Sequence, residues 1–210
     1  IVTLEENHGL AYALNEGLKH CRNDLVARMD SDDYSLPERC AKQLHEFERN
    51  KQLALIGGNT KHFYDDISQT DKRSYQPIGG DAIKKCLRRN SAFSHPTVMF
   101  RKSCVEACGG YDSDLRRSQD HDLFSRMIWK GYLCWNLEDV LVLFRADENM
   151  ILRNRNSESC KARMIIQKRL LKRHQCSLFD YVYVCAGVIA MKIFPEKLYI
   201  AIYTLLKEKR

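Results

Sequence analysis

Three aspartates stand within four positions in the stretch ARMDSDDYSLPER, residues 27–39. Asp30, Asp32 and Asp33 directly follow the apolar run DLVARM. Carboxylates this close together repel one another and raise each other's pKa unless a cation or water lies among them. Carboxylate oxygens suit Mn²⁺ or Mg²⁺, with phosphate oxygens completing the coordination shell. The cluster is therefore a candidate site for a divalent metal and a phosphate ligand, and a solvated turn is the alternative interpretation.

Two further Asp-x-Asp pairs occur in the chain. Asp112 and Asp114 follow the residues GGY, which is typical of a turn. Asp120 and Asp122 lie in an expected helix at 118–131. Positions two apart on a helix point about 200° away from each other, so only one of these two carboxylates can face a shared site.

The elements that must position the acidic cluster are strands that alternate with helices. The expected strands are residues 1–4, 24–29, 53–58, 96–101 and 139–145. The expected helices follow residue 9, begin near Ser35 and near Ser103, and cover 80–88 and 118–131. Ser35 with Glu38, and Ser103 with Glu106, have capping-box spacing. This alternation predicts an α/β domain with a largely parallel sheet, whose ligands bind beyond the carboxyl ends of its strands.

The last quarter of the chain has a different composition. Residues 158–175 form an expected basic helix, and residues 178–206 are aromatic and aliphatic, with Pro195 among them. We expect a catalytic domain at 1–150 and a helical tail at 151–210. A basic, amphipathic tail can lie on an anionic membrane surface through residues 158–206, and packing against the domain is the alternative.

Composition narrows the class of protein. The chain has 210 residues, a net charge of +7 and nine cysteines. There is no CxxC pair, so buried free thiols in a reducing, cytoplasmic compartment are expected. No apolar run reaches the roughly 20 residues that span a bilayer. The positive charge comes with no nucleic-acid recognition motif, and we expect no nucleic-acid partner.

The stretch NHGLAYALNEGLKHCRNDLVARMDSDDYSLPER resembles the nucleotide-sugar region of family-2 glycosyltransferases, which have the GT-A fold. The matching elements are an Asn-x-Gly loop (Asn7, Gly9), a helix with Asn15, and the acidic motif followed by Pro37. The segments SHPTVMFRKS, GGYD and SQDHDLFSRMIWKGY then come in the order of the family. The resemblance spans residues 1–145 and implies a Rossmann-like sheet flanked by helices.

The resemblance implies roles for the acidic residues. Asp32 would bind the metal directly, Asp30 would bind the ribose, the metal or a metal-bound water, and Asp33 would support them. Asn7, Gly9 and Asn15 would contact the nucleotide-sugar. The sequence Gln119-Asp120 stands where the family usually has Glu-Asp, which makes Asp120 the general base.

Several neighbouring residues keep two interpretations. His121 is a rival for the base or a residue behind the site. His95 either lines the acceptor side or is an ordinary loop histidine. Arg116 and Arg117 face either the diphosphate or water.

The resemblance implies an inverting, metal-dependent glycosyltransferase. It would move a hexose-type sugar from a nucleotide-sugar, with UDP as the first choice, to a saccharide or lipid-linked acceptor in polysaccharide or glycolipid assembly. The Gln-x-x-Arg-Trp signature of processive synthases is absent, so one sugar per encounter is expected.

Two features of the family lie outside this chain, namely its first strand with the P-x-Y-N loop and a second strand bearing an Asp. Roughly the first 50–60 residues of the catalytic domain are therefore expected to be missing. One alternative is an inactive or truncated homologue that binds sugar nucleotides. The other is a metal-dependent phosphoryl-transfer enzyme, although the P-loop and the Asp-x-Asp-x-Thr motif are both absent.

Overall fold

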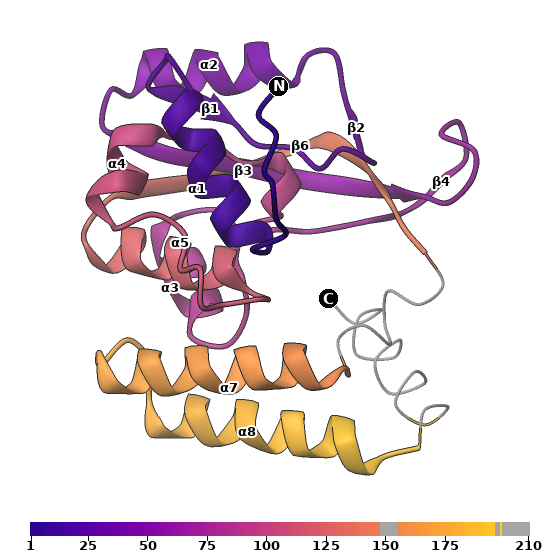
Figure 1. The fold of residues 1–210 in the computed structure, drawn as a ribbon, viewed down its shortest axis with the longest axis vertical. Helices are drawn as coiled ribbons and strands as arrows, with labels where there is room; N and C mark the ends of the chain where they lie inside the picture. Colours follow the sequence, from indigo (N-terminus) through magenta and orange to yellow (C-terminus); the bar gives the residue numbers. More distant parts are fainter. Residues whose placement is uncertain (148–154, 196–197, 199–210) are drawn as a thin grey trace. The chain divides into compact units, whose positions relative to one another are not determined.

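The computed structural model describes residues 1–147, 155–195 and 198 (Figure 1). The chain divides into two units, Ile1–Ala146 and Asp147–Arg210. The strands of the first unit are β1 (Leu25–Ala27), β2 (Tyr34–Ser35), β3 (Leu53–Phe63), β4 (Thr70–Arg73), β5 (Met99–Arg101) and β6 (Leu133–Arg145). Its helices are α1 (Leu10–His20), α2 (Arg39–Arg49), α3 (Gly80–Leu87), α4 (Lys102–Ala107) and α5 (Gln119–Trp129), with a 3-10 turn at His95–Thr97.

The strands form one mixed sheet in the order β1-β5-β3-β6-β2, with β4 paired to β3. Among the described strands only β3 and β6 run parallel. The pairs β1–β5, β2–β6, β3–β4 and β3–β5 are antiparallel. The predicted α/β class is confirmed, but the expectation of a largely parallel sheet is wrong. Strand direction depends on how each connection returns the chain, and apolar runs do not encode that.

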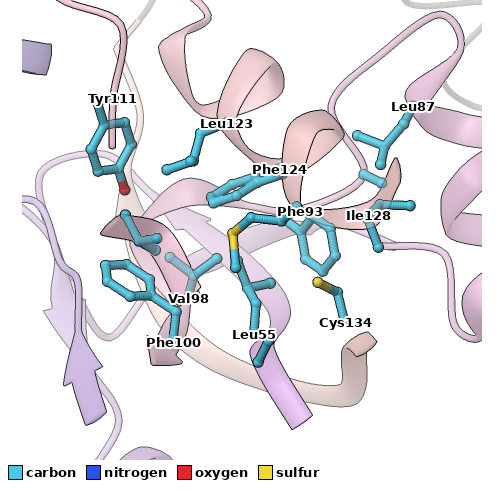
Figure 2. Close-up of a cluster of buried hydrophobic side chains, with 14 of the residues drawn as sticks. Leu55, Leu87, Phe93, Val98, Phe100, Tyr111, Leu123, Phe124, Ile128 and Cys134 are labelled. Carbon is cyan, nitrogen blue, oxygen red and sulfur yellow. The ribbon is translucent and has the colours of Figure 1, made fainter. Parts of the chain in front are cut away.

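Helices cover both faces of the sheet, because successive strand residues point to opposite sides. Leu55 of β3 and Phe100 of β5 face a large cluster that includes residues of α1, α3, α4 and α5. Figure 2 shows Leu123, Phe124 and Ile128 of α5 beside these strand residues. The neighbouring strand residues Ile56 and Met99 face the opposite side, where they pack with Phe47 of α2.

The sequence placed α2 and its buried face incorrectly. Ser35 belongs to β2, so it cannot cap a helix, and α2 begins at Arg39. Its buried residues are Arg39, Gln43 and Phe47, whereas the apolar Leu44, which apolar periodicity would place in the core, is 40% exposed.

Other boundaries also differ from the prediction. Residues 1–4 form no strand, and the expected strand at 139–145 is the end of the longer β6. β4 was not expected at all. Ser103 lies inside α4 rather than at its cap, and its backbone N–H donates to Asp24 Oδ1 at 2.9 Å.

The second unit contains α7 (Ser157–Lys172) and α8 (Leu178–Ile193). Each begins at a capped residue: Asn156 accepts from the Ser159 N–H, and Ser177 forms a capping box with Asp180. Cys160 and Met164 of α7 pack with Val184 and Val188 of α8. No helix in the described part of the chain is both long enough and apolar enough to cross a membrane. Most of the expected tail beyond Pro195 lies outside the described residues.

Candidate active site

The acidic loop between β1 and β2 contains its own cation. Arg28 directly follows β1, and its guanidinium donates to both carboxylate oxygens of Asp30, to Oδ2 at 2.8 Å. The Arg28 side chain is only 6% exposed, whereas that of Asp30 is 34% exposed. A buried arginine paired in this two-pronged way fixes the carboxylate strongly. Asp30 could therefore bind a metal only in competition with Arg28.

The other two aspartates keep unused carboxylate oxygens. Asp33 Oδ1 accepts from the backbone N–H of Arg145 at 2.9 Å, while Oδ2 is buried with no hydrogen-bond partner. Burial raises the pKa of Asp33 to about 6, the Arg145 N–H opposes this, and the charges of Asp30 and Asp32 add to it. Asp32 is exposed, and within the described residues its carboxylate makes no hydrogen bond or ion pair.

The free carboxylate oxygens of Asp32 and Asp33 fit a metal ion that also binds the oxygens of a phosphate ligand. Among the described residues no group of three or more His, Cys, Asp and Glu side chains could hold a metal ion. The loop offers the free carboxylate of Asp32 and the unpartnered Oδ2 of Asp33. Hard cations such as Mg²⁺ are commonly held by one or two carboxylates together with phosphate oxygens. The residues present therefore fit a metal–diphosphate complex and do not fit a closed, all-protein metal site.

Asp120 lies in the first turn of α5. Its Oδ2 is 3.4 Å from the Ser91 hydroxyl, which can donate to it. The residue before the helix is strained: Ser118 has φ 57°, a left-handed conformation that serine rarely adopts. The α5 geometry thus places a carboxylate that is half-buried and only weakly engaged.

Asp122 points elsewhere, as the helical spacing predicts. It is 2% exposed, and its Oδ2 accepts from Arg126 Nε at 2.8 Å. Arg126 also donates to the Gly110 carbonyl at 2.7 Å. Asp122 therefore holds α5 to the segment before it, and Asp120 is the member of the pair that is left for chemistry.

The half-buried His95 and the buried Tyr111 form a pair on which charges from both acidic regions act. His95 Nε2 lies 2.9 Å from the Tyr111 hydroxyl. Burial lowers the pKa of His95 to about 4, with the charge of Asp120 opposing the shift and that of Arg28 adding to it. Burial also raises the pKa of Tyr111, and the same two charges act on it. The charge of Arg28 in the acidic loop and the charge of Asp120 at the start of α5 therefore both act on this pair.

His121, the rival base, is committed to structure. It is 7% exposed, and its Nε2 lies 2.8 Å from the Leu87 carbonyl at the end of α3. Its ring therefore holds α3 against α5. Arg116 and Arg117 are both exposed, and a Cβ at Gly9 would lie 3.9 Å from Arg116 Cδ.

The predicted nucleotide contacts fall into two groups. The Asn7 side chain accepts from the Gly9 N–H at 3.0 Å, and Gly9 begins α1 with φ +90°. Asn15, in contrast, uses its whole amide on the backbone of Tyr111: Nδ2 donates to the carbonyl at 2.7 Å, and Oδ1 accepts from the N–H at 2.9 Å. Its role is therefore to position Tyr111, and a nucleotide contact stays a prediction for Asn7 and Gly9.

Two buried polar residues of α2 support the site and were missed from the sequence. Arg39 Nη2 donates to the Arg28 carbonyl at 2.7 Å, and Gln43 Nε2 donates to the Thr97 carbonyl at 2.8 Å. These contacts satisfy backbone groups where β1 ends and just before β5 begins. Arg39, Gln43 and Phe47 are spaced at i, i+4 and i+8, so they lie on one face of α2. A search for apolar periodicity does not detect this face because two of its three residues are polar.

Glycosyltransferases resemble this chain over most of its length. Residues 1–109 match the model of glycosyl transferase family 2. An uncharacterized glycosyltransferase of Haemophilus influenzae is 32% identical over 97% of this chain and 75% of its own length. The amylovoran biosynthesis glycosyltransferase AmsE of Erwinia amylovora is 35% identical over 83% of this chain and 65% of its own length. An Escherichia coli UDP-Gal:alpha-D-GlcNAc-diphosphoundecaprenol beta-1,3-galactosyltransferase is 27% identical over 92% of this chain and 70% of its own length.

Solved structures show the same fold at low sequence identity. The mannosyltransferase PcManGT of Pyrobaculum calidifontis, in complex with GDP-Man and Mn²⁺, has a TM-score of 0.58 at 13% identity over 91% of this chain and 52% of its own. Residues 1–349 of TarS from S. aureus, in complex with UDP-GlcNAc, have a TM-score of 0.61 at 15% identity. This match covers 90% of this chain and 55% of the TarS chain. This chain thus spans about half the length of these two solved chains. With the GT-A fold and the family match together, the chain belongs to glycosyltransferase family 2.

Proposed function

We propose that this protein transfers a hexose-type sugar from a nucleotide-sugar, with UDP as the first choice, to a saccharide or lipid-linked acceptor in polysaccharide or glycolipid assembly. The observation that supports the proposal is that charges from the acidic loop and from Asp120 both act on the His95–Tyr111 pair. AmsE is named for amylovoran biosynthesis, and the E. coli relative for a diphosphoundecaprenol-linked acceptor. One sugar would be transferred per encounter.

On the donor side, Asp32 and Asp33 would hold Mn²⁺ or Mg²⁺ together with the diphosphate. When bound, the metal would stabilise the negative charge that develops on the departing nucleoside diphosphate. Asp30 was predicted as a second ligand, but Arg28 occupies both its oxygens. We therefore assign Asp30 to the ribose or to a metal-bound water. The Mn²⁺ and GDP-Man in the PcManGT complex support a metal and a nucleotide-sugar at the level of the fold.

On the acceptor side, Asp120 would act as general base. Its carboxylate would take the proton of the acceptor hydroxyl as that oxygen attacks the anomeric carbon. The bond to the diphosphate would break on the opposite face, so a single displacement inverts the anomeric configuration. Gln119 beside it is a neutral amide and is 5% exposed.

Calorimetric titration of UDP, with and without Mn²⁺, tests the donor side. We expect binding that requires both Mn²⁺ and Asp32, so that Asp32→Ala removes it. Asp114→Ala, in an exposed turn, is the matched control and should bind as the unsubstituted protein does. Asp120→Asn should also bind UDP normally, but it should lose sugar transfer by about a hundredfold or more.

Three outcomes would contradict the proposal. Failure to bind UDP, GDP and dTDP would favour an inactive homologue. Binding that is independent of both Mn²⁺ and Asp32 would remove the metal site. Hydrolysis of the donor that proceeds equally well without an acceptor would favour phosphoryl transfer.

We further propose that the protein works at the cytoplasmic face of an anionic membrane, where a lipid-linked acceptor would lie. The support comes from the second unit. Its helix α8 exposes Leu178, Val182, Ile189 and Ile193. Lys161, Lys168 and Lys172 are exposed on α7. Exposed apolar side chains and exposed lysines within one helical unit suit the boundary of an anionic lipid surface.

A further inference from the structure

Arg145, the last residue of β6, contacts the acidic loop at two points. Its backbone N–H donates to Asp33 Oδ1 at 2.9 Å, and its Nε donates to the Asp32 carbonyl oxygen at 3.1 Å. Inside the loop, the closing hydrogen bond from the Asp33 N–H to the Asp30 carbonyl is long, at 3.4 Å. The conformation of the loop therefore depends on Arg145 more than on its own backbone.

The Arg145 side chain is itself held in place by the end of β3 and the residue that follows it. Its Nη1 donates to the Tyr64 carbonyl at 3.2 Å. Its guanidinium carbon lies 4.6 Å from the ring centroid of Phe63, which is 1% exposed. A planar guanidinium that stacks on a buried ring and donates from two nitrogens has little freedom left. Arg145, although exposed, thus connects the loop to the end of β3.

These contacts leave two carboxylate groups available. The hydrogen bond from Arg145 Nε goes to the backbone carbonyl of Asp32, and among the described residues the carboxylate of Asp32 has no partner. Arg145 takes one oxygen of Asp33, which leaves Oδ2 without a partner. Its guanidinium forms no ion pair with any carboxylate of the described residues.

We infer that Arg145 is a positioning residue for the donor site. It orients the carboxylates of Asp32 and Asp33 for a divalent cation and the diphosphate, without touching either ligand. This inference rests on the proposed function. The positioning by Arg145 depends on the planar guanidinium with its several N–H donors, and not on its positive charge, because both side-chain hydrogen bonds go to neutral carbonyls.

Replacing Arg145 by lysine separates the effect of the planar, multi-donor guanidinium from the effect of the positive charge. Lysine keeps a positive charge but cannot donate to two carbonyls from a planar group. A residue that acted as a point charge on the diphosphate would tolerate this change, whereas a positioning residue would not. Arg22, an exposed arginine after α1, provides the matched control substitution.

The experiment is a titration of Mn²⁺ followed by electron paramagnetic resonance, at saturating UDP, on the purified protein and its Arg145→Lys, Arg145→Ala and Arg22→Lys variants. We expect both Arg145 variants to bind Mn²⁺ about tenfold more weakly, and Arg22→Lys to bind as the unsubstituted protein does. Melting temperatures without metal are measured in parallel, and those of Arg145→Lys and Arg22→Lys should agree.

Each other result has a definite meaning. Normal Mn²⁺ affinity in Arg145→Lys would overturn the inference while leaving the metal site intact. A lowered melting temperature without metal, together with normal Mn²⁺ affinity in the folded protein, would reduce Arg145 to a structural residue. If the unsubstituted protein fails to bind Mn²⁺ with UDP, the proposed function fails and this inference falls with it.

Discussion

Arg28 divides the acidic cluster into two kinds of carboxylate. It neutralises Asp30 by a buried two-pronged ion pair, and it leaves Asp32 and Asp33 with free oxygens. Mutual repulsion among the three aspartates is thereby reduced before any metal binds. Arg28 precedes the aspartates by only two positions, yet the sequence did not reveal its role. The side chain could be assigned only once its burial and its pairing with Asp30 were known, because an exposed arginine at that position would be ordinary.

His95 makes the stability of the protein depend on pH. Burial lowers its pKa in the folded state to about 4, from an ordinary value of 6.5. The unfolded chain therefore takes up this proton first, and stability that is fully present above pH 6.5 is lost as the pH falls toward 4. At pH 5 this amounts to roughly 2 kcal/mol.

The measurement is urea unfolding of the unsubstituted protein and His95→Gln at pH 7.5 and pH 5. We expect His95→Gln to be less stable at pH 7.5 but to lose less stability on acidification. Equal losses in both proteins would show that other groups cause the acid sensitivity.

At the scale of elements, α1 is attached to the segment that carries Tyr111 through one side chain. Asn15 satisfies both the N–H and the carbonyl of Tyr111, and a Cβ on Gly110 would lie 2.7 Å from its Oδ1. Asn15→Ala leaves two backbone groups without partners, so we expect a loss of about 1–3 kcal/mol in the free energy of unfolding. Urea denaturation measures it.

Glu16→Ala is the control for this prediction. Glu16 neighbours Asn15 on α1 and forms only a surface ion pair with Lys19, so its loss should cost under about 1 kcal/mol. Asn15→Ala should also weaken sugar transfer, because Tyr111 supports His95 near Asp120. Unchanged stability in Asn15→Ala would mean that water replaces the amide.

The elements differ in how well their sequences predict them. The helix expected at 118–131 is present as Gln119–Trp129, with the apolar Leu123 and Met127 in the core. α2 was misplaced because its buried row contains Arg39 and Gln43, which bond to strand carbonyls. Apolar periodicity identifies a helix whose buried face consists of apolar side chains. It misses a helix whose buried face contains polar side chains that form hydrogen bonds.

At the scale of the molecule, the sequence predicted the family and the α/β class. The order and direction of the strands in the sheet became known only from the structure. Asp32 and Asp120 could be singled out because local motifs mark them. Arg145 could not, because it lies 112 residues beyond Asp33 along the chain and only the β2–β6 pairing brings the two together. Long-range contacts of this kind depend on strand order, which short motifs do not contain.

The membrane proposal gives the prediction that belongs to the whole molecule. Leu178, Val182, Ile189 and Ile193 recur at i, i+4, i+11 and i+15, so they lie along one side of α8, and each is more than half exposed. We expect the protein to sediment with phosphatidylglycerol vesicles more than with phosphatidylcholine vesicles, and less as salt rises. The double variant Val182→Gln, Ile189→Gln should bind several-fold more weakly, because glutamine keeps the helix but removes apolar area.

The control for vesicle binding is Ile67→Gln, an exposed apolar residue of the first unit that is 41% exposed. It should sediment as the unsubstituted protein does. The double variant should also keep its melting temperature, because water already reaches both side chains. A lowered melting temperature with unchanged sedimentation would mean that the exposed side of α8 packs against protein in solution, and the tail would then stabilise the enzyme without bringing it to its acceptor.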